Sequence, residues 1–167
     1  MATISHNSII AYFKDLQEKL IGLEDFFRID LAEIKGAFRS DASFPCLVVE
    51  SHESDLGKSK PNQSVNDRTF AFTVYFNPEN GNFDEQNEML DLSEAFGYKI
   101  IARMRHDATI KNHILFNRFK VSEVKNHKVG PVFNERLYGY RFTGEITAQQ
   151  PLIVSPDDWT DIDLICS

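Results

Sequence analysis

One segment, DRTFAFTVYF at residues 67–76, constrains the fold more than any other because its side chains alternate strictly. A period of two with β-branched and aromatic residues is typical of a β-strand that buries one face. The chain has 167 residues, of which 14 are Phe, so we expect a core built on rigid rings. The inward positions are Phe70, Phe72, Val74 and Phe76, and the outward positions are Thr69, Ala71, Thr73 and Tyr75.

Other segments also have strand character. Residues 44–51 contain the continuous apolar run CLVV, which favours a strand covered on both faces. Residues 26–38 are ambiguous and are predicted as a short extended piece followed by a helical turn. Residues 116–127 are predicted as a strand, and residues 134–148 as a long alternating one. In the latter, Tyr138, Tyr140, Phe142 and Ile146 share one face, and Leu137, Arg141, Thr143 and Glu145 share the other.

Two amphipathic helices are predicted from apolar residues at spacings of three and four. The first runs from about Ile9 to Leu23, with Ser5 or Ser8 as its cap. The second begins near Asp84, which we expect to cap it, and contains Gly97, where we expect a close packing contact. Its predicted apolar face consists of Met89, Leu92, Phe96, Ile100, Ile101 and Met104.

The order of these elements predicts an α+β fold. Strands joined by turns or loops favour an antiparallel sheet, and both main helices would bury their apolar faces on one side of it. The other face, with Thr73, Tyr75, Arg141 and Thr143, is more polar and would be solvated or covered by a partner. Residues 1–150 form the predicted single domain, with a long loop at residues 51–67 between the first two strands. Residues 151–167 form an acidic C-terminal tail.

Composition excludes several classes of function. The formal net charge of −7 argues against binding to nucleic acid, which needs clustered Lys and Arg. Two cysteines make no disulfide framework, which favours a reduced, cytoplasmic chain. The N-terminal residues lack a basic region followed by an apolar core, so we expect no signal peptide, and no apolar stretch approaches the length that spans a bilayer.

Three sets of side chains are candidates for chemistry. His52, Glu53 and Asp55 are potential metal ligands, with His106, Asp107 or His113 as further candidates, but their loop setting favours a solvated role. Cys46 is a potential nucleophile, but it lies in an apolar strand where burial makes a thiol inert. The acidic residues Asp84, Glu85 and Glu88 are explained by the helix dipole. Phosphate-binding glycine motifs and a nucleophile elbow are absent. We therefore expect no enzyme activity, cofactor or metal.

Four stretches carry a family resemblance: SFPCLVVES, RTFAFTVYF, EAFGYKIIARM and YGYRFTGEITA. Their order, with an amphipathic helix before them and a polar loop between the first two, resembles the tail-terminator, or tail-completion, proteins of long-tailed bacteriophages and prophages. The resemblance implies an α+β subunit in a homo-oligomeric ring, commonly a hexamer. That ring caps the tail tube and joins it to the connector. The protein would be found in the bacterial host cytoplasm during assembly and then in the virion tail.

The resemblance also suggests which residues contact a neighbour or the tube. The loop would project from the ring, and the acidic segment PDDWTDID would be a second contact. Trp159 would act either as its anchor or as a cap over its own core. The predicted contact residues are Leu56, Lys58, Lys60, Asn62, Arg68, Tyr75, Arg141 and Trp159. Two alternatives remain: a cytoplasmic module that binds a protein or peptide on its sheet edge or polar face, and a hydrolase that uses His52, Glu53 and Asp55.

Overall fold

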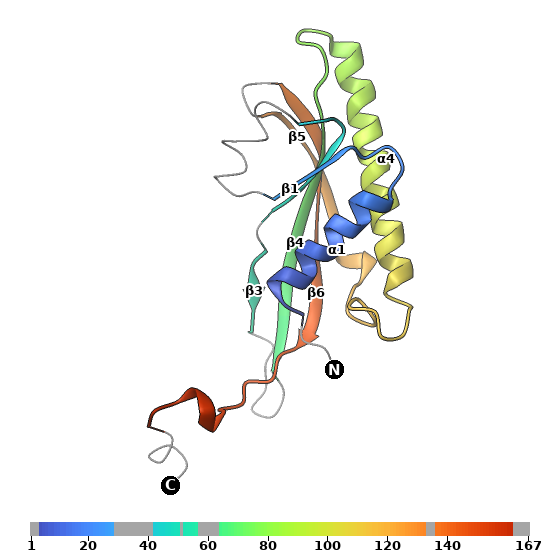
Figure 1. Cartoon of the computed structure of the whole chain (residues 1–167). Coiled ribbons are helices and arrows are strands. Elements are labelled where there is room, and N and C mark those ends of the chain that lie inside the picture. The colour runs from blue at the N-terminus through green and yellow to red at the C-terminus, as the bar shows by residue number, and fades with distance from the viewer. Residues whose placement is uncertain (1–3, 29–41, 51, 57–63, 133–135, 162–167) are drawn as a thin grey trace.

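The fold is a single sheet with two long helices on one of its faces (Figure 1). The computed structural model describes residues 4–28, 42–50, 52–56, 64–132 and 136–161. The helices are α1 (His6–Lys19) and α4 (Phe83–Asp107). The strands are β1 (Asp25–Arg28), β2 (Cys46–Val49), β3 (Ser54–Asp55), β4 (Val65–Phe76), β5 (Lys125–Val132) and β6 (Leu137–Gln149). The predicted α+β fold class is confirmed.

The long strands β4 and β6 form the centre of the sheet. They pair in antiparallel register from Val65 opposite Gln149 to Phe76 opposite Tyr138. The strand order is β1-β2-β4-β6-β5, with the short β3 paired to β4 beside this path. All of these pairs are antiparallel except β1 with β2. The prediction of a wholly antiparallel sheet is therefore wrong at this edge. A parallel pair needs a long connection, which residues 29–45 supply.

The main core lies between the helices and the sheet. The predicted inward face of β4 is confirmed, because Phe70, Phe72, Val74 and Phe76 are all buried there. Phe72 stacks on Phe142 of β6, with ring centroids 5.3 Å apart. From α1, the buried side chains Ile9, Tyr12, Phe13 and Leu16 complete this layer.

Helix α1 begins as predicted. Ser5 is its N-cap, and its hydroxyl accepts from the backbone N–H of Ser8, while the Ser8 hydroxyl accepts from the Ser5 N–H. Such a capping box satisfies two backbone donors that a helix start leaves unpaired.

Helix α4 confirms two predictions and corrects two. A Cβ atom added at Gly97 would overlap the ring of Phe142, so the close packing expected at this glycine is present. The N-cap is Asn82, whose side chain accepts from the Glu85 N–H, and not Asp84. Leu92 is exposed, whereas Leu90 and Ser93 are buried, so the predicted stripe is wrong at Leu92. Ile100, Ile101 and Met104 are buried as predicted.

The second face of the sheet is less polar than predicted. Tyr75 and Thr73 are buried there, and Leu137 from β6 joins them. Strand β1, which lies where a short extended piece was predicted, adds Phe27 to the same layer, so the face is covered over this half. This second cluster consists of Phe27, Cys46, Val48, Tyr75 and Leu137, with Ala42, Phe44, Val129 and Val132 packed against it.

The strand predicted at residues 116–127 starts later and ends later. Phe119 forms only an isolated bridge with Ile146. A 3-10 turn, η1 (Val121–Glu123), follows, and the strand proper is β5. Buried Phe119 belongs to the main core, so apolar character here reflects packing of a turn segment and not a strand.

Candidate functional site

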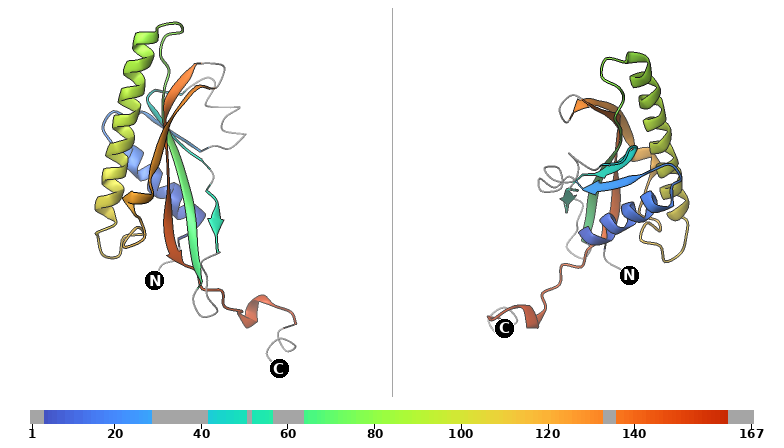
Figure 2. Two further views of the ribbon diagram at one scale, coloured as in Figure 1. Left: turned by 180° about the vertical axis from the view of Figure 1, so that it is seen from behind. Right: turned by 45° about the horizontal axis from the view of Figure 1, so that its top comes forward.

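The C-terminal segment exposes four large apolar side chains within a short stretch of chain. After β6, residues 150–161 leave the sheet and run away from the body and from α4 in the views of Figures 1 and 2. They contain the short turn η2 (Pro156–Asp158). The exposed fractions are 62% for Leu152, 83% for Ile153, 50% for Val154 and 54% for Trp159. Of the two roles predicted for Trp159, a cap over its own core is therefore wrong.

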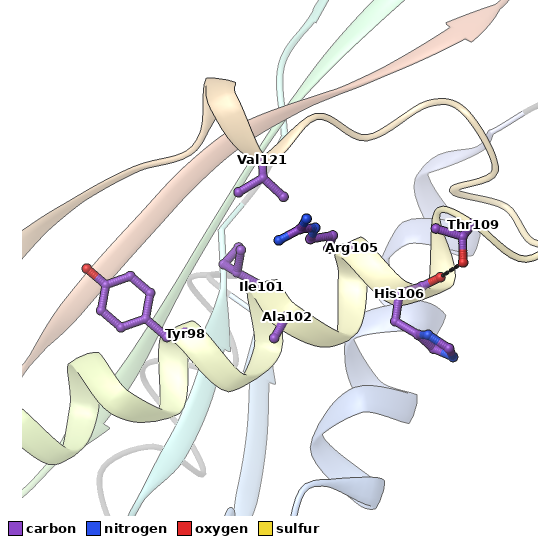
Figure 3. Close-up of a pocket in the computed structure, with 7 residues that line it drawn as sticks. All are labelled: Tyr98, Ile101, Ala102, Arg105, His106, Thr109 and Val121. Carbon is purple, nitrogen blue, oxygen red and sulfur yellow. Dashed lines mark hydrogen bonds between the residues drawn. The ribbon is translucent and has the colours of Figure 1, made fainter.

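A groove lies along α4 on the surface of the molecule (Figure 3). Its volume is about 470 Å³. Arg105 extends toward Val121 of η1, which forms the opposite wall, and the Thr109 hydroxyl donates to the carbonyl oxygen of His106 at 2.7 Å. None of its lining residues is acidic. They are Tyr98, Ile101, Ala102, Arg105, His106, Thr109 and Val121.

Sequence reasoning missed this α4 groove. Tyr98, Ala102, Arg105 and Thr109 recur at spacings of three and four, but on the side of α4 that does not face the sheet. Because residues three and four apart lie side by side on a helix, this spacing could have indicated that the four side chains share one surface. However, the opposite wall, Val121, comes from a segment that was predicted as part of a strand.

A smaller hollow of about 110 Å³ lies between α1 and α4. Lys19 and Arg103 line it, but Lys19 pairs with Asp15 at 2.7 Å and Arg103 with Asp107 at 2.8 Å. These charges are already engaged within their own helices, and little volume remains for a ligand.

Two predicted contact residues are used within the chain. Arg141 donates to both carboxylate oxygens of Glu50, at 2.5 and 2.7 Å, and this pairing raises the pKa of the arginine. Tyr75 is only 5% exposed, and burial raises its pKa to about 12. A contact role for the Tyr75 side chain is not compatible with this burial.

The polar loop is partly ordered as strand. β3 pairs with β4 at Ser54 opposite Arg68, and Leu56 just beyond it is exposed. Of the remaining loop predictions, Lys58, Lys60 and Asn62 lie outside the described residues.

Two basic residues, His6 and Arg68, lie beside His52. Its Nε2 lies 3.2 Å from a guanidinium nitrogen of Arg68, and its ring centroid lies 4.7 Å from that of His6. Burial, and then the charges of His6 and Arg68, lower the pKa of His52. Positive neighbours repel a cation, so this arrangement is opposite to that of a metal site. Within the described ranges, no three His, Cys, Asp or Glu side chains lie close enough to hold a metal ion.

The other candidates for chemistry have structural partners. Buried Asp107 accepts from the Tyr12 hydroxyl at 2.9 Å and from Arg103 at 2.8 Å, and His113 lies 3.9 Å away. This network joins α1 to α4. Cys46 is fully buried, and burial raises its thiol pKa to about 12, so it is not a nucleophile at neutral pH.

These features define an α+β chain that presents an apolar and acidic C-terminal segment and, elsewhere, a groove with basic side chains. Comparison of the sequence with models of protein families gives no match, and comparison with curated proteins gives none either. No helix in the described part of the chain is long and apolar enough to cross a membrane.

Proposed function

We propose that the chain is a structural tail protein of a bacteriophage or prophage, of the tail-terminator type. Copies of it form a ring that caps the tail tube and joins it to the connector. The ring assembles in the bacterial host cytoplasm and becomes part of the virion tail. It acts by contact, without catalysis, metal or cofactor.

The exposed C-terminal segment is the observation that carries the proposal. Leu152, Ile153, Val154 and Trp159 lie within eight positions of one another, and each is at least half exposed. Burying one large apolar side chain is worth about 1.5–3 kcal/mol, so a partner surface over this segment would stabilise a complex substantially. Trp is also the residue most often found as an anchor of protein interfaces.

The β5 edge of the sheet favours contacts through side chains over pairing with another strand. β5 is an outer strand, and Lys125 and Lys128 are exposed on it, with Pro131 near its end. Lysine and proline on an edge strand oppose addition of another strand. A ring needs a heterologous interface, in which two different surfaces of the subunit meet. The segment supplies one such surface without using the sheet edge.

Light scattering over a wide concentration range, with negative-stain images of the same fractions, tests this proposal. We expect closed rings, either of the protein alone or after addition of isolated tail tubes. A chain that stays monomeric and leaves tube ends bare under both conditions would contradict it.

A protein- or peptide-binding module is the second candidate, and the α4 groove favours it. Such a module would remain monomeric and bind a host protein through the groove. We would favour this function over the first if the chain stays monomeric, does not bind tail tubes and binds a host protein at stoichiometric ratio.

A further inference from the structure

We infer that the C-terminal segment of one copy binds in the α4 groove of a second copy, so that each subunit is linked to the next head to tail. The inference rests on the proposed ring and names the contact that builds it. The segment is residues 151–161, and the groove is the one lined by Tyr98, Ala102, Arg105 and Val121 among others.

The two surfaces are complementary in charge. The segment carries Asp157, Asp158 and Asp161 and no basic residue. The groove carries Arg105 and His106 and no acidic residue, although the chain as a whole has a net charge of −7. Arg105 forms no ion pair with any described residue, so its guanidinium is available to a carboxylate.

The surfaces are also complementary in apolar character. Tyr98, Ile101 and Val121 give the groove an apolar lining, and Tyr98 and Val121 are partly exposed. The segment offers an indole ring directly after two carboxylates, Asp157 and Asp158. The indole ring of Trp159 would pack on the apolar lining while the carboxylates of Asp157 and Asp158 face Arg105. Both the apolar and the basic side chains of the groove would then be in contact with the segment. A groove of about 470 Å³ has room for one large aromatic side chain.

The direction of the segment favours a neighbour over the same copy. In Figures 1 and 2 it leaves the end of β6 and runs away from α4. Residues 150–155 can span up to about 20 Å when extended, enough to bridge to an adjacent subunit. Because segment and groove lie on different parts of the subunit, their pairing is heterologous, which is the type of contact that closes into rings.

Photocrosslinking in the full chain tests the contact directly. The photoreactive residue p-benzoylphenylalanine replaces Thr160, which is exposed and leaves Trp159 intact. Equal amounts of ¹⁴N- and ¹⁵N-labelled protein are mixed, irradiated and analysed by mass spectrometry. We expect crosslinks of mixed isotope composition to peptides containing residues 98–109 or Val121. Crosslinks within single copies, crosslinks to other surfaces, or none at all would overturn the inference.

Charge reversal provides an independent test with a matched control. Arg105→Glu places a negative charge in the groove, and Lys99→Glu makes the same change on another side of α4. We expect Arg105→Glu to weaken self-association at least about tenfold, as loss of an interface anchor does, and Lys99→Glu to leave it within about twofold. Trp159→Ala is expected to match Arg105→Glu. Equal effects of the two charge reversals would contradict the inference.

Mixing the Trp159→Ala and Arg105→Glu variants distinguishes loss of the contact between segment and groove from general misfolding. Trp159→Ala keeps an intact groove, and Arg105→Glu keeps an intact segment. Each alone is expected to be monomeric, whereas the mixture forms dimers and nothing larger, because only one good contact can form. Failure to form dimers would count against the contact.

If both variants still form rings like the parent chain, the inference fails and the ring proposal stands. If groove crosslinks form but no ring appears on light scattering or on tail tubes, the ring proposal fails instead.

Discussion

Gly97 in α4 lies against the ring of Phe142, and no Cβ fits between them. Glycine costs about 1 kcal/mol relative to alanine inside a helix, so propensity alone would favour Gly97→Ala. Overpacking a core costs about 1–3 kcal/mol, and here the obstacle is a stacked ring held by Phe72. We expect the substitution to lower the free energy of unfolding by about 1–2 kcal/mol, measured by urea denaturation.

The propensity term in that measurement has its own control. Ala95→Gly at an exposed position of the same helix reports the helix cost without a packing change, and is expected to destabilise by about 1 kcal/mol. Phe142→Leu combined with Gly97→Ala should recover part of the loss, because the smaller side chain yields space. A Gly97→Ala variant more stable than the parent would contradict the close contact.

The lowered pKa of His52 should make the stability of the folded chain depend on pH. Its pKa is lowered in the folded chain, chiefly by burial, so the unfolded chain binds more protons between the folded pKa and the ordinary value near 6.5. Stability from this group is therefore complete above the ordinary value and is lost as the pH falls toward the folded pKa. We expect urea midpoints to fall between pH 7.5 and pH 5.5, and His52→Gln to reduce that fall.

The matched control for His52 is His127→Gln, an exposed histidine on β5. Because His127 is exposed, its replacement should not reproduce the effect of His52→Gln. If His52→Gln and the parent lose the same stability over this pH range, the basic cluster of His6, His52 and Arg68 does not act as described.

At the scale of elements, Asp107 is the main polar link between α1 and α4. It is buried and accepts hydrogen bonds from Tyr12 and Arg103. Removing it leaves the Tyr12 hydroxyl without its partner, and an unsatisfied buried polar group costs about 1–3 kcal/mol. We expect Asp107→Ala to lower the free energy of unfolding by about 2–3 kcal/mol.

Comparison with Asp91→Ala, at an exposed position of α4, separates the loss of this link from a general effect of removing an acid; that change should stay within about 0.5 kcal/mol. A double-mutant cycle with Tyr12→Phe should show coupling, because both changes remove the same hydrogen bond. Strictly additive effects would argue against the link.

The elements also show what the sequence could predict. β4 and the main helix faces followed from their periodicity, because each buries one regular stripe. An extended piece was predicted where β1 lies, but its pairing in the sheet was not, because four residues carry too little pattern and its place depends on a parallel partner. Tyr75 was predicted as a contact because alternation placed it opposite the core, but alternation does not reveal that Phe27 and Leu137 cover that face. The α4 groove could not be predicted without the position of η1, which depends on tertiary packing.

For the whole molecule, the remaining question is whether the polar loop contributes to assembly. Residues 57–63 connect β3 to β4, whose antiparallel pairing at Asp55 and Asp67 is described. Replacing residues 58–64 with a short Asn-Gly turn would join position 57 to position 65 and so keep the register in which Asp55 lies opposite Asp67, because a two-residue turn of this type suits antiparallel neighbours. We expect the unfolding free energy to change by less than about 0.5 kcal/mol, while capping of isolated tail tubes is impaired.

Because the variant is expected to fold normally and yet to cap tubes poorly, it tests whether the loop contacts a neighbouring subunit or the tube. A long loop adds little to the stability of a fold, and long loops often carry a function outside it. A replacement by Gly-Ser residues of equal length distinguishes loss of side-chain contacts from loss of reach. If both variants cap tubes as the parent does, the loop is not an assembly arm, and the C-terminal segment alone must supply the contact between subunits. If the short turn impairs capping and the Gly-Ser variant does not, the loop acts through its length and not through Lys58 or Lys60.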